Sequence, residues 1–91
     1  MTYMLCRNRV ADFNRWKAVF SSHQSAHLEA GLKLVKIWRG IEDRDDVFFL
    51  FDVQGVEMAK VFISNPEAAK TGAEAGVLEG EYHFVEDAGG Y

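Results

Sequence analysis

The segment Val47–Val53 places the strongest restriction on the fold, because it is apolar along both of its sides. In an extended strand, successive side chains point to opposite faces of the sheet. One side of this segment carries Val47, Phe49, Phe51 and Val53, and the other carries Phe48, Leu50 and Asp52. Strands of this composition are covered on both faces, so we expect a central strand of a sheet.

The flanking segments switch between the two-residue period of strands and the 3.6-residue period of helices. This pattern predicts strands at Tyr3–Val10, Leu32–Ile41, Val47–Val53 and Glu79–Glu86, and helices at 13–30, Val56–Ile63 and Pro66–Ala75. Asp12 suits the N-cap of the first helix and Gly31 its end, while Pro66 suits the first turn of the last helix.

The order β-α-β-β-α-β, with the second helix broken at Pro66, predicts an α+β domain of the ferredoxin-like kind. Such a domain has a four-stranded antiparallel sheet with helices on one face. We expect a single domain at 1–87 and a flexible tail at 88–91. Because the two-sided apolar strand also needs cover on the open face, we expect a homodimer. In it, a second copy stacks its sheet on the first and forms a dimeric α/β barrel.

Composition and charge limit the kinds of binding partner and the cellular compartment that we expect for this chain. The 91 residues carry 10 basic and 14 acidic side chains, a net charge of −4, and no basic cluster. We therefore expect neither nucleic acid nor a membrane as a partner, and no segment approaches the roughly 18 apolar residues of a membrane helix. The single cysteine, Cys6, and the absence of a signal-peptide pattern at the N-terminus favour the cytoplasm.

Three stretches resemble small uncharacterised proteins of the dimeric α/β-barrel superfamily. They are Val10–Phe20 followed by His23, the strand end and charged turn from Trp38 to Val47, and Phe62–Glu67. The most similar branch contains candidate cyclases and antibiotic-biosynthesis-monooxygenase-like proteins. The resemblance implies a cofactor-independent monooxygenase, cyclase or isomerase that acts on a small aromatic or polyketide-like compound. Of the motif positions of that branch, only His23 carries over.

His23 and His27 are the leading candidates for proton transfer. They lie four residues apart and extend the helical stripe of Phe13, Trp16 and Phe20. Histidine titrates near neutral pH, so His23 suits a general base or acid that His27 assists. The competing interpretation is a half-buried histidine bonded to a backbone carbonyl.

Arg7 is the third candidate catalytic residue, because an arginine can orient an anionic or enolate substrate. Arg7 and Arg9 share one face of the first strand, and we favour the alternative that they pair with Glu81 or Asp52 across strands. His83, on the last strand, is expected to face the dimer interface as an ordinary polar residue.

Large aromatic side chains are the candidate walls of a substrate pocket. These residues are Trp16, Phe20, Trp38, Phe49, Phe51 and Tyr82. Strand aromatics belong to the core more often than to a ligand site, and they become pocket walls only where a helix leaves a gap above the sheet. We expect Cys6 to be buried as a small apolar residue.

No cofactor and no metal site is predicted. Two histidines one turn apart can hold an ion, but a third ligand would have to come from His83, Glu81 or Asp52. Haem, with His23 or His27 as axial ligand, is an alternative. A further alternative to an enzyme is a non-catalytic module that binds a small apolar ligand or serves in assembly.

Overall fold

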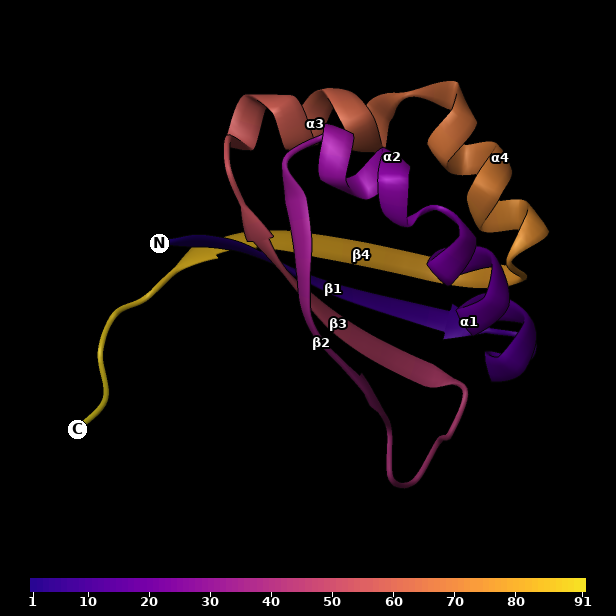
Figure 1. Ribbon diagram of the computed structural model, residues 1–91. Coiled ribbons are helices and arrows are strands. Elements are labelled where there is room, and N and C mark those ends of the chain that lie inside the picture. The colour runs from indigo at the N-terminus through magenta and orange to yellow at the C-terminus, as the bar shows by residue number, and fades with distance from the viewer.

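The helices all lie on one face of a four-stranded antiparallel sheet in the computed structural model, which describes all 91 residues (Figure 1). The elements are β1 (Thr2–Val10), α1 (Phe13–Ser22), α2 (Gln24–Glu29), β2 (Leu32–Arg39), β3 (Asp46–Val53), α3 (Val56–Ser64), α4 (Pro66–Glu74) and β4 (Val77–Glu86). The strand order is β2-β3-β1-β4, and every neighbouring pair is antiparallel. The predicted ferredoxin-like α+β fold is confirmed.

Local sequence signals fix the helix ends. The Asp12 carboxylate accepts the Arg15 backbone N–H at 3.3 Å, as an N-cap does. The Asn65 side chain caps α4 by accepting the Glu67 N–H at 2.9 Å, and Pro66 follows as its first residue. Gly31 and Gly76 have φ values of 77° and 76°, the left-handed conformation that favours glycine after a helix. Asp12, Gly31 and Pro66 therefore mark helix ends as predicted.

The long first helix predicted at 13–30 is wrong, because the chain turns at His23. That residue has φ −100° and ψ 16°, and its N–H bonds to the Phe20 carbonyl at 3.1 Å, three residues back instead of four. The Ser22 hydroxyl donates to the Val19 carbonyl at 2.6 Å, a local bond that competes with the regular helical pattern. The turn sets α2 at an angle to α1.

Two strand boundaries also differ from prediction. The last strand starts at Val77 instead of Glu79, because Val10 still pairs with Val77 after an irregularity in the β1–β4 register. The second strand ends at Arg39 instead of Ile41, where the chain enters the charged turn. No helix is both long enough and apolar enough to cross a membrane.

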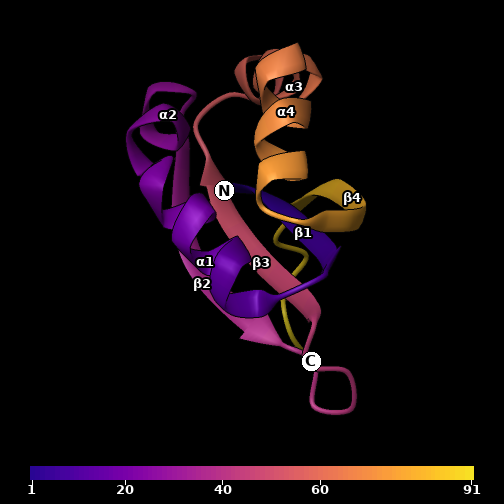
Figure 2. The same ribbon diagram turned by 90° about the vertical axis from the view of Figure 1, so that its right-hand side faces the viewer.

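The central position of β3 is confirmed, since it pairs with β2 on one side and β1 on the other. Its side chains at Val47, Phe49, Phe51 and Val53 are buried under the helices. Its other side chains are only half-buried, so the single chain covers β3 on one face. Figure 2 shows α1 and α2 over one half of the sheet and α3 and α4 over the other.

The two strand arginines pair on the open face of the sheet. Arg7 Nε bonds Asp46 Oδ1 at 2.6 Å and lies 3.6 Å from Glu81, while Arg9 lies 2.9 Å from Asp43. The predicted pairing with Glu81 is confirmed. The predicted pairing with Asp52 is wrong, because the β1–β3 register puts Asp52 opposite Tyr3, away from both arginines.

Candidate functional site

A cavity of about 440 Å³ lies between the two pairs of helices and the covered face of the sheet. Its floor comes from β1, β3 and β4, one wall comes from α1 and α2, and the opposite wall comes from α3 and α4. Of its 18 lining residues, 11 are hydrophobic. An apolar cavity with a few polar groups is the usual form of a small-molecule site.

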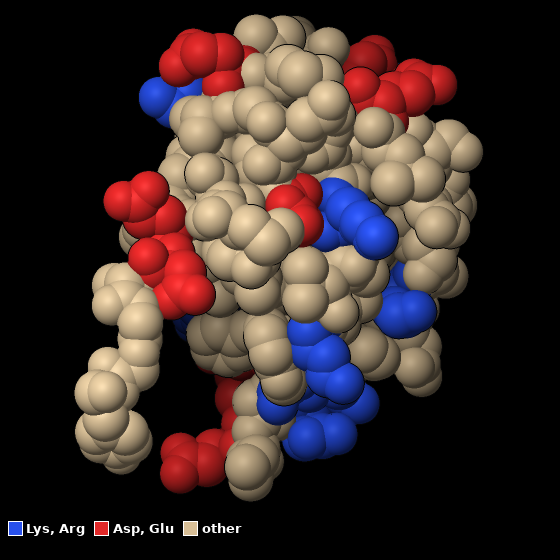
Figure 3. All heavy atoms as spheres, turned by 60° about the vertical axis from the view of Figure 1, so that its left-hand side comes forward, with Lys and Arg blue, Asp and Glu red and all other residues tan.

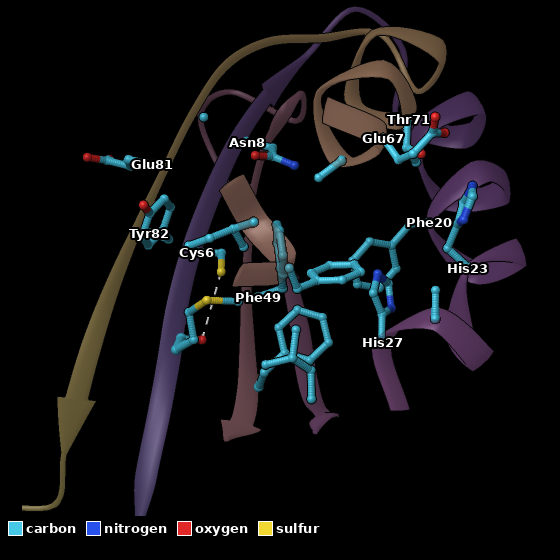
Figure 4. Close-up of a pocket in the computed structure, with 18 residues that line it drawn as sticks. Cys6, Asn8, Phe20, His23, His27, Phe49, Glu67, Thr71, Glu81 and Tyr82 are labelled. Carbon is cyan, nitrogen blue, oxygen red and sulfur yellow. Dashed lines mark hydrogen bonds between the residues drawn. The ribbon is translucent and has the colours of Figure 1, made fainter. Parts of the chain in front are cut away.

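The His27 side chain lines this cavity from α2 and packs against three phenyl rings. Its ring centroid lies 4.9 Å from that of Phe20, 5.2 Å from that of Phe51 and 5.8 Å from that of Phe62 (Figure 4). Burial disfavours the imidazolium and lowers the pKa of His27, and the neighbouring His23 lowers it further. The side chain is therefore a neutral imidazole at neutral pH.

This lowered pKa predicts acid sensitivity of the fold. The unfolded chain binds a proton at His27 near pH 6.5, whereas the folded chain binds it only at lower pH, so the free energy of unfolding falls as pH drops through the interval between the two values. We expect His27→Phe to flatten this dependence in urea unfolding curves between about pH 7.5 and about pH 5. His83→Gln, on the open face, is the control. If the free energy of unfolding of His27→Phe changed with pH as steeply as that of wild type, His27 would not be the source of the pH dependence.

His23 lines the same cavity from the junction between α1 and α2. Its side chain is half-buried, and Figure 4 shows it near Glu67 and Thr71 of α4. Neither His23 nor His27 makes a side-chain hydrogen bond within the chain, so the backbone-carbonyl interpretation does not describe them. Both imidazoles are free to bond a ligand.

The predicted aromatic walls divide into two groups. Phe20, Phe49, Phe51 and Tyr82 line the cavity. Trp16 lies behind it, only 1% exposed, and packs its ring against Phe20 at 4.6 Å and Phe49 at 5.4 Å. Trp38 lies on the open face opposite Phe48 and is 45% exposed, so it is far from the cavity.

Arg7 lies on the opposite side of the sheet from His23 and His27. It points to the open face, where its guanidinium pairs with Asp46, while its neighbours Cys6 and Asn8 point to the cavity. Cys6 is buried as predicted, and burial raises the pKa of its thiol to about 12.

Three polar residues of the cavity were absent from the sequence prediction: Asn8, Glu67 and Thr71. Asn8 lies on the same face of β1 as the buried Met4 and Cys6, because side chains of a strand alternate between its two faces. This alternation could have identified Asn8 from the sequence. Glu67 and Thr71 lie one turn apart on the same face of α4. The sequence does not indicate that this face of the helix packs towards the cavity.

The proposed third metal ligands do not converge on the two histidines. The register places Asp52 opposite Tyr3 and His83 opposite Leu5, on the open face of the sheet. Glu81 borders the cavity, but its carboxylate lies 3.6 Å from the Arg7 guanidinium. No group of three or more histidine, cysteine, aspartate or glutamate side chains is close enough to hold a metal ion.

No protein-family model matches the chain, and no curated protein matches it. Several solved structures, in contrast, match the chain over nearly its whole length. A candidate antibiotic biosynthesis monooxygenase from Bordetella bronchiseptica has a TM-score of 0.77 at 15% identity, over 96% of each chain. A protein of the same description from Chloroflexus aurantiacus has a TM-score of 0.65 at 19% identity, over 100% of this chain and 97% of that one. An uncharacterized NIPSNAP domain protein from Burkholderia xenovorans has a TM-score of 0.67 at 10% identity, over 97% and 95%. At these identities the likeness shows a shared fold, and that fold is the ferredoxin-like one that the sequence resemblance implied.

Proposed function

We propose that this chain is a small enzyme that removes a proton from an aromatic or polyketide-like compound held in the cavity. The observation that carries the proposal is a neutral imidazole, His27, set among phenyl rings in a cavity of about 440 Å³. A neutral imidazole can accept a proton, and the rings suit a flat apolar substrate. Structural neighbours described as candidate antibiotic biosynthesis monooxygenases favour oxygenation over cyclisation or isomerisation.

The oxygenation that fits this site uses O₂ as the only co-reactant. His27 takes a proton from an activated CH₂ group, and the resulting carbanion adds O₂ to form a hydroperoxide once a proton returns. Loss of water then leaves a ketone. One oxygen atom stays in the product, and the other leaves in water with both hydrogens of the CH₂ group. The phenyl rings keep bulk water from the carbanion, and His23 at the edge of the cavity exchanges the proton with solvent.

Turnover is expected to fall when His27 is replaced while ligand binding persists. His27→Phe keeps the ring packing and removes the proton acceptor, so the O₂ consumption rate with anthrone should fall by about 10²- to 10⁴-fold. His23→Ala should also reduce turnover, since it removes the exchange with solvent. Ser25→Ala, exposed on the same helix as His27, is the control. Full turnover in His27→Phe would contradict the role of this residue.

A non-catalytic binding module is the second candidate function. It is favoured by one observation: no carboxylate or carbonyl of the chain is bonded to either imidazole, although catalytic histidines are commonly held by such a partner. This module would bind flat aromatic compounds with equal affinity in wild type and His27→Phe and would consume no O₂. A Soret band after addition of haemin would favour the haem alternative.

We propose further that a second copy of this chain covers the open face of the sheet. At the centre of that face, Leu5 of β1 lies opposite Leu50 of β3, and Trp38 of β2 lies opposite Phe48. These side chains form an apolar strip on an otherwise charged face. A homodimer with stacked sheets would bury this strip in both copies.

Charge supports the same arrangement. On the open face, the β2 edge carries Lys33 and Lys36, and the β4 edge carries Glu79 and Glu81. Figure 3 shows most of the basic side chains of this view in its lower right part, and acidic ones beside the C-terminal tail as well as at the top and the lower end. A two-fold axis that lays β2 of one copy near β4 of the other would bring opposite charges together at both edges.

A further inference from the structure

Asn8 presents a carboxamide to the cavity from the C-terminal part of β1 (Figure 4). The amide is held in place at both ends. The amide satisfies both ends when its oxygen and nitrogen are exchanged relative to the orientation drawn in Figure 4: the oxygen then accepts a hydrogen bond from Trp16 Nε1 at 3.1 Å, and the nitrogen donates to the Arg7 carbonyl at 3.0 Å. Trp16 is one of the most deeply buried side chains of the protein, so the orientation of the amide is anchored in the core.

One donor of this amide is left over. A carboxamide nitrogen carries two N–H groups, and the bond to Arg7 uses one of them. No other group of the chain accepts the second N–H. The indole N–H of Trp16 is a donor only, so it bonds to the amide oxygen of Asn8 and cannot accept a hydrogen bond from the amide nitrogen. The second N–H of Asn8 therefore has no partner.

Gly80 of β4 provides the space beside this amide. A Cβ at position 80 would lie 3.1 Å from the end of the Asn8 side chain, closer than ordinary van der Waals contact. Gly80 also lines the cavity, opposite Asn8 in the β1–β4 register. A glycine in the middle of a strand weakens it, and a close approach at that position is one reason for such a residue.

We propose that Asn8 is a positioning residue that donates a hydrogen bond to a carbonyl oxygen of the bound aromatic compound. This inference rests on the proposed function and names the substituent that the site recognises. Asn8 extends from the sheet floor and His27 from the helical wall, so a molecule between them meets both. When His27 takes the proton, the electron pair left on carbon delocalises onto the carbonyl oxygen, and the fixed N–H stabilises the resulting enolate.

A pair of ligands that differ in one oxygen tests this proposal. 1-Tetralone carries an aryl ketone, and tetralin has the same rings without the oxygen. We expect wild type to bind 1-tetralone more tightly than tetralin by about three- to tenfold, the ratio that one net hydrogen bond provides, in titrations followed by NMR. Asn8→Asp keeps the acceptor for Trp16 but removes both N–H groups, so the ratio should fall to about one. Asn14→Asp makes the same change at an exposed position of α1, outside the cavity, and should keep the wild-type ratio.

Each outcome decides the proposal. If both compounds bind wild type and the preference persists in Asn8→Asp, Asn8 is not the donor, while the proposed pocket remains. If neither compound binds wild type, the pocket proposal fails and the role of Asn8 fails with it. If Asn8→Asp does not fold, the side-chain NH₂ signals of Asn8 in wild type serve instead. They should shift with 1-tetralone and not with tetralin, and equal shifts would overturn the proposal.

Discussion

Replacing Trp16 with alanine is expected to lower the free energy of unfolding by about 3–5 kcal/mol. The side chain is 1% exposed and packs against Phe13, Phe20 and Phe49. Its removal opens a cavity under the phenyl cluster and leaves the Asn8 oxygen without its donor. Total stabilities of small domains are about 5–15 kcal/mol, so this loss is a large fraction of the total.

Urea unfolding followed by circular dichroism at a fixed protein concentration measures this effect. Leu28→Ala is the control, because Leu28 is a large apolar residue that is 54% exposed on α2. We expect its effect to stay within about 0.5 kcal/mol, as for other surface substitutions. A Trp16→Ala protein as stable as Leu28→Ala would show that the indole does not hold the helices on the sheet.

The fold was predictable because its signals are local and mutually consistent. The two-sided apolar segment at Val47–Val53 could only be a central strand, and Asp12, Gly31 and Pro66 marked helix ends by their own backbone and side-chain chemistry. The break at His23 was not predictable in this way. The apolar stripe continues through His23 at helical spacing and gives no sign of the turn, where the Ser22 hydroxyl bonds to the Val19 carbonyl.

Two periodicities indicated which residues line the cavity: helical spacing placed Phe20, His23 and His27 on one stripe, and strand parity separates the two faces of β1. Cys6 is buried, so alternation sends Arg7 to the open face and Asn8 to the cavity, although the sequence prediction gave weight to Arg7 and passed over Asn8. Tertiary packing decided the rest. Trp16 and Phe20 belong to one helical stripe, yet Phe20 lines the cavity and Trp16 is buried behind it.

Introducing a charge at Leu5 is expected to abolish the homodimer and leave the single chain folded. Leu5 lies at the centre of the open face, between Leu50 on β3 and His83 on β4, and is 38% exposed in the single chain. In the proposed dimer, Leu5→Glu would bury a carboxylate in each copy next to apolar side chains, at a high cost in desolvation. In the single chain the same carboxylate stays in contact with water, so the fold tolerates it.

Size-exclusion chromatography with light scattering measures the mass of wild type, Leu5→Glu and a control. Leu28→Glu adds the same charge to the helical side of the molecule, away from the proposed interface, and should remain dimeric. If wild type is a monomer, or if Leu5→Glu and Leu28→Glu are both dimers, the open face is not the interface. A wild-type dimer that only Leu5→Glu dissociates would explain why β3 is apolar on both sides. The helices of its own chain cover one face, and the sheet of the partner copy covers the other.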